Sequence, residues 1–330
     1  MSSAPPTVLV TGASGLLGRD IIKAFERDGD WKVVGTALSR ANPPSIVKLD
    51  LQDDAAIKQL LDDVQPKVIV HSAANRFPDK VEADKALAHA VNVAPTRLLA
   101  SEAASRSIFL IYISTDYVFP GLPGQAPYTT SSPAAPTNAY GQTKYEGEVA
   151  VLEQTAQGST QLPVPAVVLR VPLLYGHCEK DDPSKSAVHP LIDALWKAQT
   201  LPPGAPKIKV DDYALRYPTC TEDVGRVCRD IAKLYTSDQN RPDLPRILHF
   251  SAEEQYTKYG MCKLFADEIL ALPMENVVPW DPTKDEGQAT ATVRPYNTHL
   301  DTSVLKHLGI DVSTMNFLAW WKRELKAFRH

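Results

Sequence analysis

The stretch TVLVTGASGLLG, Thr7 to Gly18, decides the fold. Its first five residues form an apolar run that predicts a buried strand, and Leu16 to Phe25 follow the spacing of an amphipathic helix. The glycines between them, Gly12, Gly15 and Gly18, permit a tight turn, close approach of the backbone to a ligand and close packing of helix on strand. A helix that begins at such a turn directs unpaired N–H groups at an anion. We expect the pyrophosphate of a dinucleotide at Thr11, Gly12, Gly15, Leu16, Leu17 and Gly18.

The first half of the chain repeats this alternation of apolar runs and helical patterns. We expect further strands at Trp31–Leu38, Ile46–Asp50, Lys67–Ala73, Ser107–Ser114 and Ala166–Pro172. The longest helical pattern between them runs from about Glu82 to Ser105. Unalternating apolar strands separated by helices indicate a parallel sheet covered on both faces. The predicted fold class is therefore α/β, with a Rossmann-type doubly wound parallel sheet.

The pattern changes beyond Pro172. Charged loops, separate helices, an irregular stretch from about Pro273 to Asp301 and a last helix near Asn316–Phe328 replace the regular alternation. Trp320 and Trp321 are expected to pack that last helix. We expect residues 1–172 to form the Rossmann domain, with 220–250 returning to it. Residues 173–219 and 251–330 would form a smaller, discontinuous C-terminal lobe for a substrate or a partner.

Composition excludes several classes of protein. The 330 residues are 44% hydrophobic, which suffices for a large core, and a net charge of −4 with mixed signs argues against nucleic acid as a partner. The apolar run Ile108–Ile113 is too short to cross a bilayer, and the N-terminus lacks the pattern of a signal peptide. Four cysteines without CxxC spacing predict reduced thiols in a cytoplasmic protein. No metal is expected, because His177, Cys178, Glu179 and Asp181 match no compact zinc motif.

The residues after the second strand predict which dinucleotide binds. An acidic residue there would bind the ribose 2′-hydroxyl of NAD, but Thr36–Ser39 contains none. Arg40 follows, and its guanidinium suits the 2′-phosphate of NADP; the alternative is a surface arginine without a ligand. We therefore expect NADP(H) rather than NAD(H). The predicted contacts are Ser39 and Arg40 after the second strand, Asp50 and Leu51 at the adenine, and Ala73 and Ala74 where small side chains leave room.

A tyrosine and a lysine four residues apart suggest a catalytic pair. Tyr140 and Lys144, in YGQTK, would share one face of a helix. Ser114 and Thr115 end a central strand, at the sheet edge where ligands bind in such folds. A nearby ammonium would lower the tyrosine pKa from about 10, and either hydroxyl could polarise a substrate carbonyl. Thr115, Tyr140 and Lys144 therefore predict a hydride-transfer site, with an ordinary helix face as the alternative. Tyr140 and Lys144 are also expected to contact the cofactor, with Lys144 hydrogen-bonding the nicotinamide ribose. His71 is expected to be a core histidine.

Taken together, these motifs resemble an extended short-chain dehydrogenase/reductase. The segments ISTDYVFPG, YGQTKYEGE, LRVPLLYG and TVRPYNTHLDTSVLKHLGI are similar to the dTDP-4-dehydrorhamnose reductase family, and the resemblance runs from Thr7 to about Ile310. It implies that Thr115, Tyr140 and Lys144 carry the NADPH-dependent reduction of a 4-keto sugar nucleotide. It also places an RPxNxxLD segment in the substrate lobe, made of Arg294, Pro295, Asn297, Leu300 and Asp301.

The segment after LYG departs from that family. Bacterial reductases usually carry a GxNF-type segment there, whereas this chain reads HCEKDDPSKSAVHPLIDALW. With HSAANRFPDKVE, RYPTCTEDVGRVCR and HFSAEEQYTKYGMCKLFADEILALP, it is more similar to the regulatory (beta) subunits of methionine adenosyltransferase. That branch implies NADP binding, Leu174 near the nicotinamide, and association with the catalytic subunit that makes S-adenosylmethionine. A regulatory subunit is therefore the first hypothesis, and a keto-sugar-nucleotide reductase is the alternative.

Overall fold

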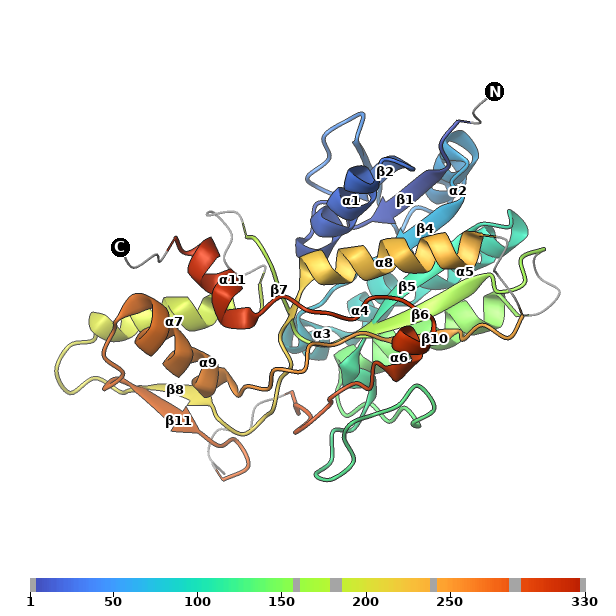
Figure 1. The fold of residues 1–330 in the computed structure, drawn as a ribbon. Helices are drawn as coiled ribbons and strands as arrows, with labels where there is room; N and C mark the ends of the chain where they lie inside the picture. Colours follow the sequence, from blue (N-terminus) through green and yellow to red (C-terminus); the bar gives the residue numbers. More distant parts are fainter. Residues whose placement is uncertain (1–3, 157–160, 179–185, 238–241, 285–291, 327–330) are drawn as a thin grey trace.

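A seven-stranded parallel sheet forms the centre of the molecule (Figure 1). The computed structural model describes residues 4–156, 161–178, 186–237, 242–284 and 292–326. The strands lie in the order β10 (Ile247–His249), β6 (Ala166–Val171), β5 (Phe109–Thr115), β4 (Val68–His71), β1 (Thr7–Thr11), β2 (Lys32–Ala37) and β3 (Ile46–Lys48). The chain starts in the middle and winds outward in both directions, so the predicted doubly wound α/β fold is confirmed.

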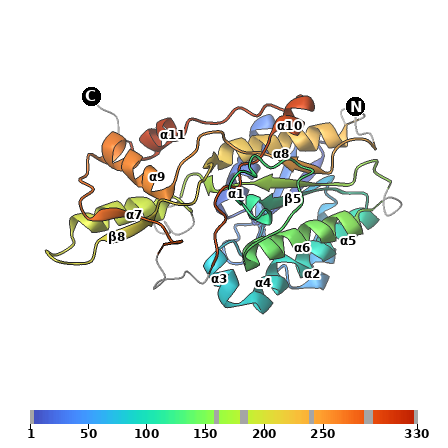
Figure 2. The ribbon, with the colours of Figure 1, turned by 90° about the horizontal axis from the view of Figure 1, so that it is seen from below.

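Helices cover both faces of the sheet (Figure 2). On one face lie α1 (Leu16–Asp28) and α8 (Thr221–Thr236), packed against each other. The other face carries α2 (Asp54–Val64), α4 (Lys85–Asn92), α5 (Ala94–Ser105) and α6 (Ala139–Gln154). Along β1, Val8 and Val10 join the core beneath α1 and α8, whereas Leu9 joins the core beneath α2 and α5. The strands are apolar without interruption because alternate side chains enter two different cores.

The single long helix expected from about Glu82 to Ser105 is three helices. They are α3 (Pro78–Ala83), α4 and α5. The Asp84 carboxylate accepts a hydrogen bond from the Leu87 N–H at 2.9 Å and caps α4, which separates it from α3. Pro95 has no N–H to continue a helix and lies in the first turn of α5. Both breaks bend the chain around the end of the sheet.

The C-terminal elements build a second core. Its elements are α7 (His189–Gln199), α9 (Lys258–Phe265), the π-helical turn η3 (Ala266–Leu270), α11 (Phe317–Glu324) and a parallel pair of strands, β8 (Ile208–Asp211) and β11 (Val277–Trp280). Strand β11 lies within the stretch from Pro273 to Asp301 that was expected to be irregular, so that expectation was wrong there. Trp320 and Trp321 are buried in this core, as predicted.

Short elements connect the two cores. Strand β7 (Leu174–Tyr175) pairs with β9 (Thr219–Cys220), a 3-10 turn η1 (Asp116–Val118) follows β5, and α10 (Ser303–His307) lies near β10. Strand β10, far along the chain, pairs in parallel with β6. Within the described ranges, the helices are all too short or too polar to cross a membrane.

Candidate cofactor and catalytic site

The turn between β1 and α1 is shaped so that only glycine fits at its first position. Gly12 has a φ of +71°, and a Cβ there would lie 2.9 Å from the Ala73 Cα at the end of β4. A Cβ on Gly18 would lie 2.2 Å from the Gly12 carbonyl oxygen, so the first turn of α1 also needs a glycine. The N-cap of α1, Gly15, has no side chain to cap the first N–H groups. The turn therefore directs free backbone donors away from the sheet.

A cavity of about 550 Å³ lies over this turn. It contains twelve of the sequence-predicted cofactor residues, namely Gly12, Gly15, Leu16, Leu17, Gly18, Ser39, Arg40, Asp50, Leu51, Ala73, Ala74 and Leu174. The structure thus brings these residues together at the carboxyl ends of the neighbouring strands β1 and β4, where the winding of the sheet changes direction. Ligands bind at this place in this class of fold.

Thr11 does not line that cavity. Its hydroxyl lies 2.7 Å from His71 Nδ1, and His71 Nε2 lies 2.9 Å from the Thr96 hydroxyl. Burial and then the Lys144 charge lower the pKa of His71 to about 3, so the ring is neutral. The prediction of a core histidine agrees with this network. Thr11 supports the strand end rather than facing the cavity.

Arg40 crosses from the end of β2 to the turn. Its Nη2 donates to the Ser14 carbonyl oxygen at 2.7 Å. One face of the guanidinium is thus fixed to the glycine turn, while the side chain also lines the cavity beside Ser39. An arginine held in this way is oriented before any ligand binds.

A second cavity, of about 250 Å³, contains the predicted catalytic residues. Thr115 enters it from the end of β5, and Tyr140 and Lys144 enter it from α6. The Asn138 side chain accepts from the Gly141 N–H at 2.9 Å and fixes the start of α6 just before Tyr140. Both cavities are lined by Leu17, Ser72, Ala74, Arg76 and Leu174. The two cavities are therefore neighbouring parts of one site.

Lys144 is deeply buried, at 4% exposed. Its Nζ lies 4.0 Å from the centre of the Tyr112 ring, which stabilises a cation through the ring face. Burial nevertheless lowers the pKa of Lys144 to about 7, and the Glu148 charge only partly opposes this. The lysine is therefore a mixture of ammonium and neutral amine near neutral pH.

The expected direction of the Tyr140 pKa shift was wrong. Burial and then the Asp116 charge raise the pKa of Tyr140 to about 12, while Thr115 and Arg76 oppose that shift. The lysine on the same helix face does not lower it, because Lys144 lies over Tyr112 instead. Tyr140 therefore holds its proton at neutral pH.

The two hydroxyls at the end of β5 have different partners. Ser114 donates to Glu148 at 2.5 Å, and Glu148 is held by two hydrogen bonds from Arg170, at 2.9 and 2.6 Å. Ser114 is thereby tied into a buried ion-pair network. Thr115 donates to the Asp116 carboxylate at 3.0 Å. Of the two hydroxyls that the sequence allowed, Thr115 is therefore the better placed for a ligand.

Comparison with known proteins assigns the chain to a family. A family profile described as the RmlD substrate binding domain matches residues 6–328. Methionine adenosyltransferase 2 subunit beta from Danio rerio is 39% identical over 98% of this chain and 91% of its own length. The protein of the same name from Xenopus tropicalis is 42% identical over 93% of this chain and 83% of its own length. The chain belongs to the beta-subunit branch of the RmlD family.

A solved structure with the same fold is more distant in sequence. The dTDP-4-dehydrorhamnose reductase from Bacillus anthracis, in complex with NADP, is 21% identical. It covers 98% of each chain with a TM-score of 0.74. At this identity the likeness shows that this chain shares the fold of the reductase.

Sequence reasoning missed several polar residues of the site in this member of the beta-subunit branch. Arg76, Asp116, Arg216 and Lys258 all line the catalytic cavity. Asp116 follows β5 directly and Arg76 lies in the loop that follows β4, so their place after strand ends was a usable signal. Arg216 and Lys258 lie in segments quoted above for their resemblance to the beta subunits, but no residue pattern there marked them as site residues, and the fold brings them to the cavity.

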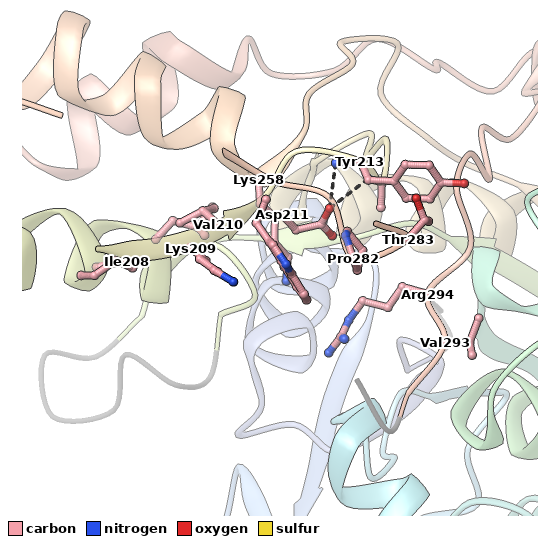
Figure 3. Close-up of a pocket in the computed structure, with 14 residues that line it drawn as sticks. Ile208, Lys209, Val210, Asp211, Tyr213, Lys258, Pro282, Thr283, Val293 and Arg294 are labelled. Atoms are coloured by element: carbon pink, nitrogen blue, oxygen red, sulfur yellow. Dashed lines mark hydrogen bonds between the residues drawn. The ribbon is translucent and has the colours of Figure 1, made fainter. Parts of the chain in front are cut away.

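The residues of the RPxNxxLD segment have two kinds of role: one of them lines a cavity, and the others stabilise the surrounding structure. Arg294 lines both the catalytic cavity and a third cavity, of about 500 Å³, beside β8 and β11 (Figure 3). The Asn297 side chain accepts from the His299 N–H, and Asp301 accepts from the Ser303 N–H, each at 3.0 Å. Leu300 is buried. In this chain, the segment therefore supplies one cation to the site and otherwise supports the lobe.

The charged loop after β7 gives no metal site among the described residues. Grouped His, Cys, Asp or Glu ligands are absent from those residues. Glu179 and Asp181 lie outside them, while His177 Nδ1 lies 2.8 Å from the Glu324 carboxylate on α11. In this beta-subunit relative, His177 thus connects the loop to the last helix.

Proposed function

We propose that this chain is an NADP(H)-binding regulatory subunit that binds the catalytic subunit of a methionine adenosyltransferase, the enzyme that makes S-adenosylmethionine. The observation that carries this proposal is the match to beta subunits over nearly the whole chain. A cytoplasmic location fits the four cysteines, which are all buried.

The residues of the first cavity suit NADP(H). The glycine turn would hold the pyrophosphate, Arg40 the 2′-phosphate, and Asp50 and Leu51 the adenine end. Ala73, Ala74 and Leu174 would leave space for the nicotinamide end, and the Lys144 amine would hydrogen-bond the nicotinamide ribose. Bound NADPH supplies a hydride donor. A nicotinamide dinucleotide is supported by the cavity over the turn, and the choice of NADP rests on Arg40.

The substitution Arg40→Met tests the choice of cofactor. A charge-assisted hydrogen bond contributes about 1.5–3 kcal/mol, so we expect the preference for NADPH over NADH to fall by roughly 10- to 100-fold. Loss of the contact to the Ser14 carbonyl would weaken both cofactors alike, so the ratio of the two dissociation constants isolates the 2′-phosphate. An unchanged ratio, or tighter binding of NADH by the wild type, would overturn this assignment.

A reductase is the second candidate, because Thr115, Tyr140 and Lys144 line one cavity. In that reaction Tyr140 would give its proton to the carbonyl oxygen and Thr115 would orient the substrate. Burial raises the pKa of Tyr140 to about 12, so in this structure it is a weaker acid than a free tyrosine.

Replacing Tyr140 by phenylalanine separates the two functions. We expect Tyr140→Phe to keep NADPH affinity and association with the catalytic subunit within about twofold, because it removes one hydroxyl at the nicotinamide end. A reductase would instead consume NADPH on a dTDP-4-keto-6-deoxyhexose and lose that activity in the variant. Such activity in the wild type, without any association with a catalytic subunit, would replace our first proposal by the second.

A further inference from the structure

Glu148 is a buried carboxylate whose partners tie helix α6 to two strands of the sheet. It is 1% exposed. The Ser114 hydroxyl on β5 donates to it at 2.5 Å, and Arg170 on β6 donates to both of its oxygens, at 2.9 and 2.6 Å. The paired donors of Arg170 fix the carboxylate in one position. Apolar side chains of similar volume often stabilise a core as well as a buried ion pair does, so this network calls for a functional explanation.

Glu148 lies one helical turn after Lys144, on the same face of α6. Opposite them, Tyr112 and Ser114 are two residues apart and lie on one face of β5. The Lys144 amine lies over the Tyr112 ring, at 4.0 Å from its centre, while Glu148 accepts from Ser114. The amine and the carboxylate therefore lie in the same layer between the helix and the strand.

Gly147 permits this close packing of strand on helix. A Cβ on Gly147 would lie 2.2 Å from the Tyr112 hydroxyl oxygen, so a larger residue there would push Tyr112 away from α6. The Tyr112 hydroxyl instead donates to the Lys144 carbonyl oxygen at 3.4 Å. The ring that supports the Lys144 amine is thus held by the same helix.

Glu148 is the charged group that favours the ammonium form of Lys144. Burial lowers the pKa of Lys144 to about 7, and the Glu148 charge opposes this shift. Within the described parts of the chain, the amine itself makes no hydrogen bond or ion pair, so its donors are free for a ligand.

The other titratable groups packed around Lys144 do not supply a negative charge. Burial raises the pKa values of Tyr112 on β5 and Tyr140 on α6, so both keep their protons. His71, at the end of β4, is neutral because burial lowers its pKa to about 3. None of these three groups can therefore replace Glu148 as the counter-charge.

The charged residues of the catalytic cavity do not replace it either. Asp116, which follows β5, already accepts hydrogen bonds from two threonine hydroxyls, and burial raises its pKa. Arg76, Arg216 and Lys258 also line this cavity, and their charges have the same sign as an ammonium. These cations cannot favour the ammonium form of Lys144.

We propose that Glu148 is a positioning residue of the cofactor site, whose carboxylate keeps Lys144 as an ammonium directed at the nicotinamide ribose of NADP(H). Ser114 and Arg170 hold the carboxylate, and the Tyr112 ring supports the ammonium. A charged donor makes stronger hydrogen bonds to ribose hydroxyls than a neutral amine does. The inference rests on the NADP(H) binding of the proposed function.

The pH dependence of NADPH affinity, measured by fluorescence titration, tests this role. The affinity of the wild type should fall as pH rises through about 7, because Lys144 loses its proton there. Glu148→Gln removes the charge with little change in shape, and should move this fall to lower pH by at least about half a unit. Glu153→Gln removes an exposed carboxylate from the same helix and should leave the profile unchanged. Comparison of each variant with the wild type at the same pH cancels the titration of the cofactor's own phosphate.

A double-mutant cycle with Lys144→Met separates an effect through Lys144 from a general loss of structure. At about pH 8, Glu148→Gln should weaken NADPH binding at least about threefold when Lys144 is present. When methionine replaces Lys144, the same change should have an effect of less than about 1.5-fold, because no ammonium remains to be lost.

A second variant avoids the unpaired charge that Glu148→Gln leaves on Arg170. Glu148→Gln combined with Arg170→Met removes both charges, and it should shift the profile in the same direction. Circular dichroism identifies the folded variants. An unchanged profile in either folded variant, or equal weakening with and without Lys144, would overturn this inference alone. Absence of NADPH binding to the wild type would overturn the proposed function, and this inference with it.

Discussion

Replacing Gly12 by alanine probes the geometry on which cofactor binding depends. A φ of +71° disfavours an L-residue by roughly 1–2 kcal/mol. The new Cβ would also lie 2.9 Å from the Ala73 Cα and 3.0 Å from the Ala73 nitrogen. No side-chain rotation relieves contact with backbone atoms, so the turn or the end of β4 must move, at about 1–3 kcal/mol. Together the two effects should lower the free energy of unfolding by about 2–5 kcal/mol.

Gly29 provides a matched control for that substitution. Its φ is +76°, but a Cβ there would meet nothing within 4 Å. Gly29→Ala should therefore lower the free energy of unfolding by only about 1–2 kcal/mol. Urea unfolding with and without NADP measures both effects. At about 100 times its dissociation constant, NADP should stabilise the wild type and Gly29→Ala by about 2.7 kcal/mol, and Gly12→Ala much less. Equal destabilisation by the two variants, or full NADP stabilisation of Gly12→Ala, would refute this reasoning.

Three further substitutions, one of them with an exposed control, test buried groups. The pKa of Lys144 falls from 10.5 in the unfolded chain to about 7 in the folded protein. Between pH 7 and 10.5 the lysine is therefore protonated in the unfolded chain but neutral in the folded protein, so the free energy of unfolding of the wild type should rise with pH. Lys144→Met should remove that rise and be more stable than the wild type by up to roughly 3–5 kcal/mol below pH 7. Urea unfolding at pH 6.5 and 9.5 measures this, and an equal difference in stability between variant and wild type at the two pH values would contradict it. Glu148→Gln leaves Arg170 without its carboxylate and should lower stability by about 3–5 kcal/mol, whereas Glu153→Gln, in an exposed pair, should lower it by under about 1 kcal/mol; chemical denaturation should separate the two. Trp321→Ala should lower stability by roughly 3–5 kcal/mol without changing NADPH affinity in a fluorescence titration, and a matching loss of affinity would show that the second core also shapes the cofactor cavity.

Those parts of the site that depend on local spacing could be predicted from the sequence. The segment from Thr7 to Gly18 is continuous, and a strand, three glycines and a helix in that order specify one turn. Tyr140 and Lys144 lie four residues apart on one helix, and Thr115 ends a strand, so the topology brings them to one edge. The ladder of parallel strands follows from apolar runs that enter two cores.

The electrostatics of the site depend on packing and could not be predicted in this way. The pKa of Tyr140 moves upward because burial and Asp116 outweigh the opposing groups, and burial is set by every layer around the tyrosine. Arg216 and Lys258 lie in separate segments that meet only when the second core folds against the sheet. Asp84 and Pro95 are residue types that indicate helix starts, but the apolar periodicity continues across them and led to the prediction of one long helix.

Association with a methionine adenosyltransferase catalytic subunit is the most direct test of the central claim. Analytical ultracentrifugation of the purified chain with that subunit, with and without saturating NADP, measures the complex. We predict a stable complex at about micromolar concentrations that Tyr140→Phe leaves intact. No complex at about 10 μM in either condition would contradict the account.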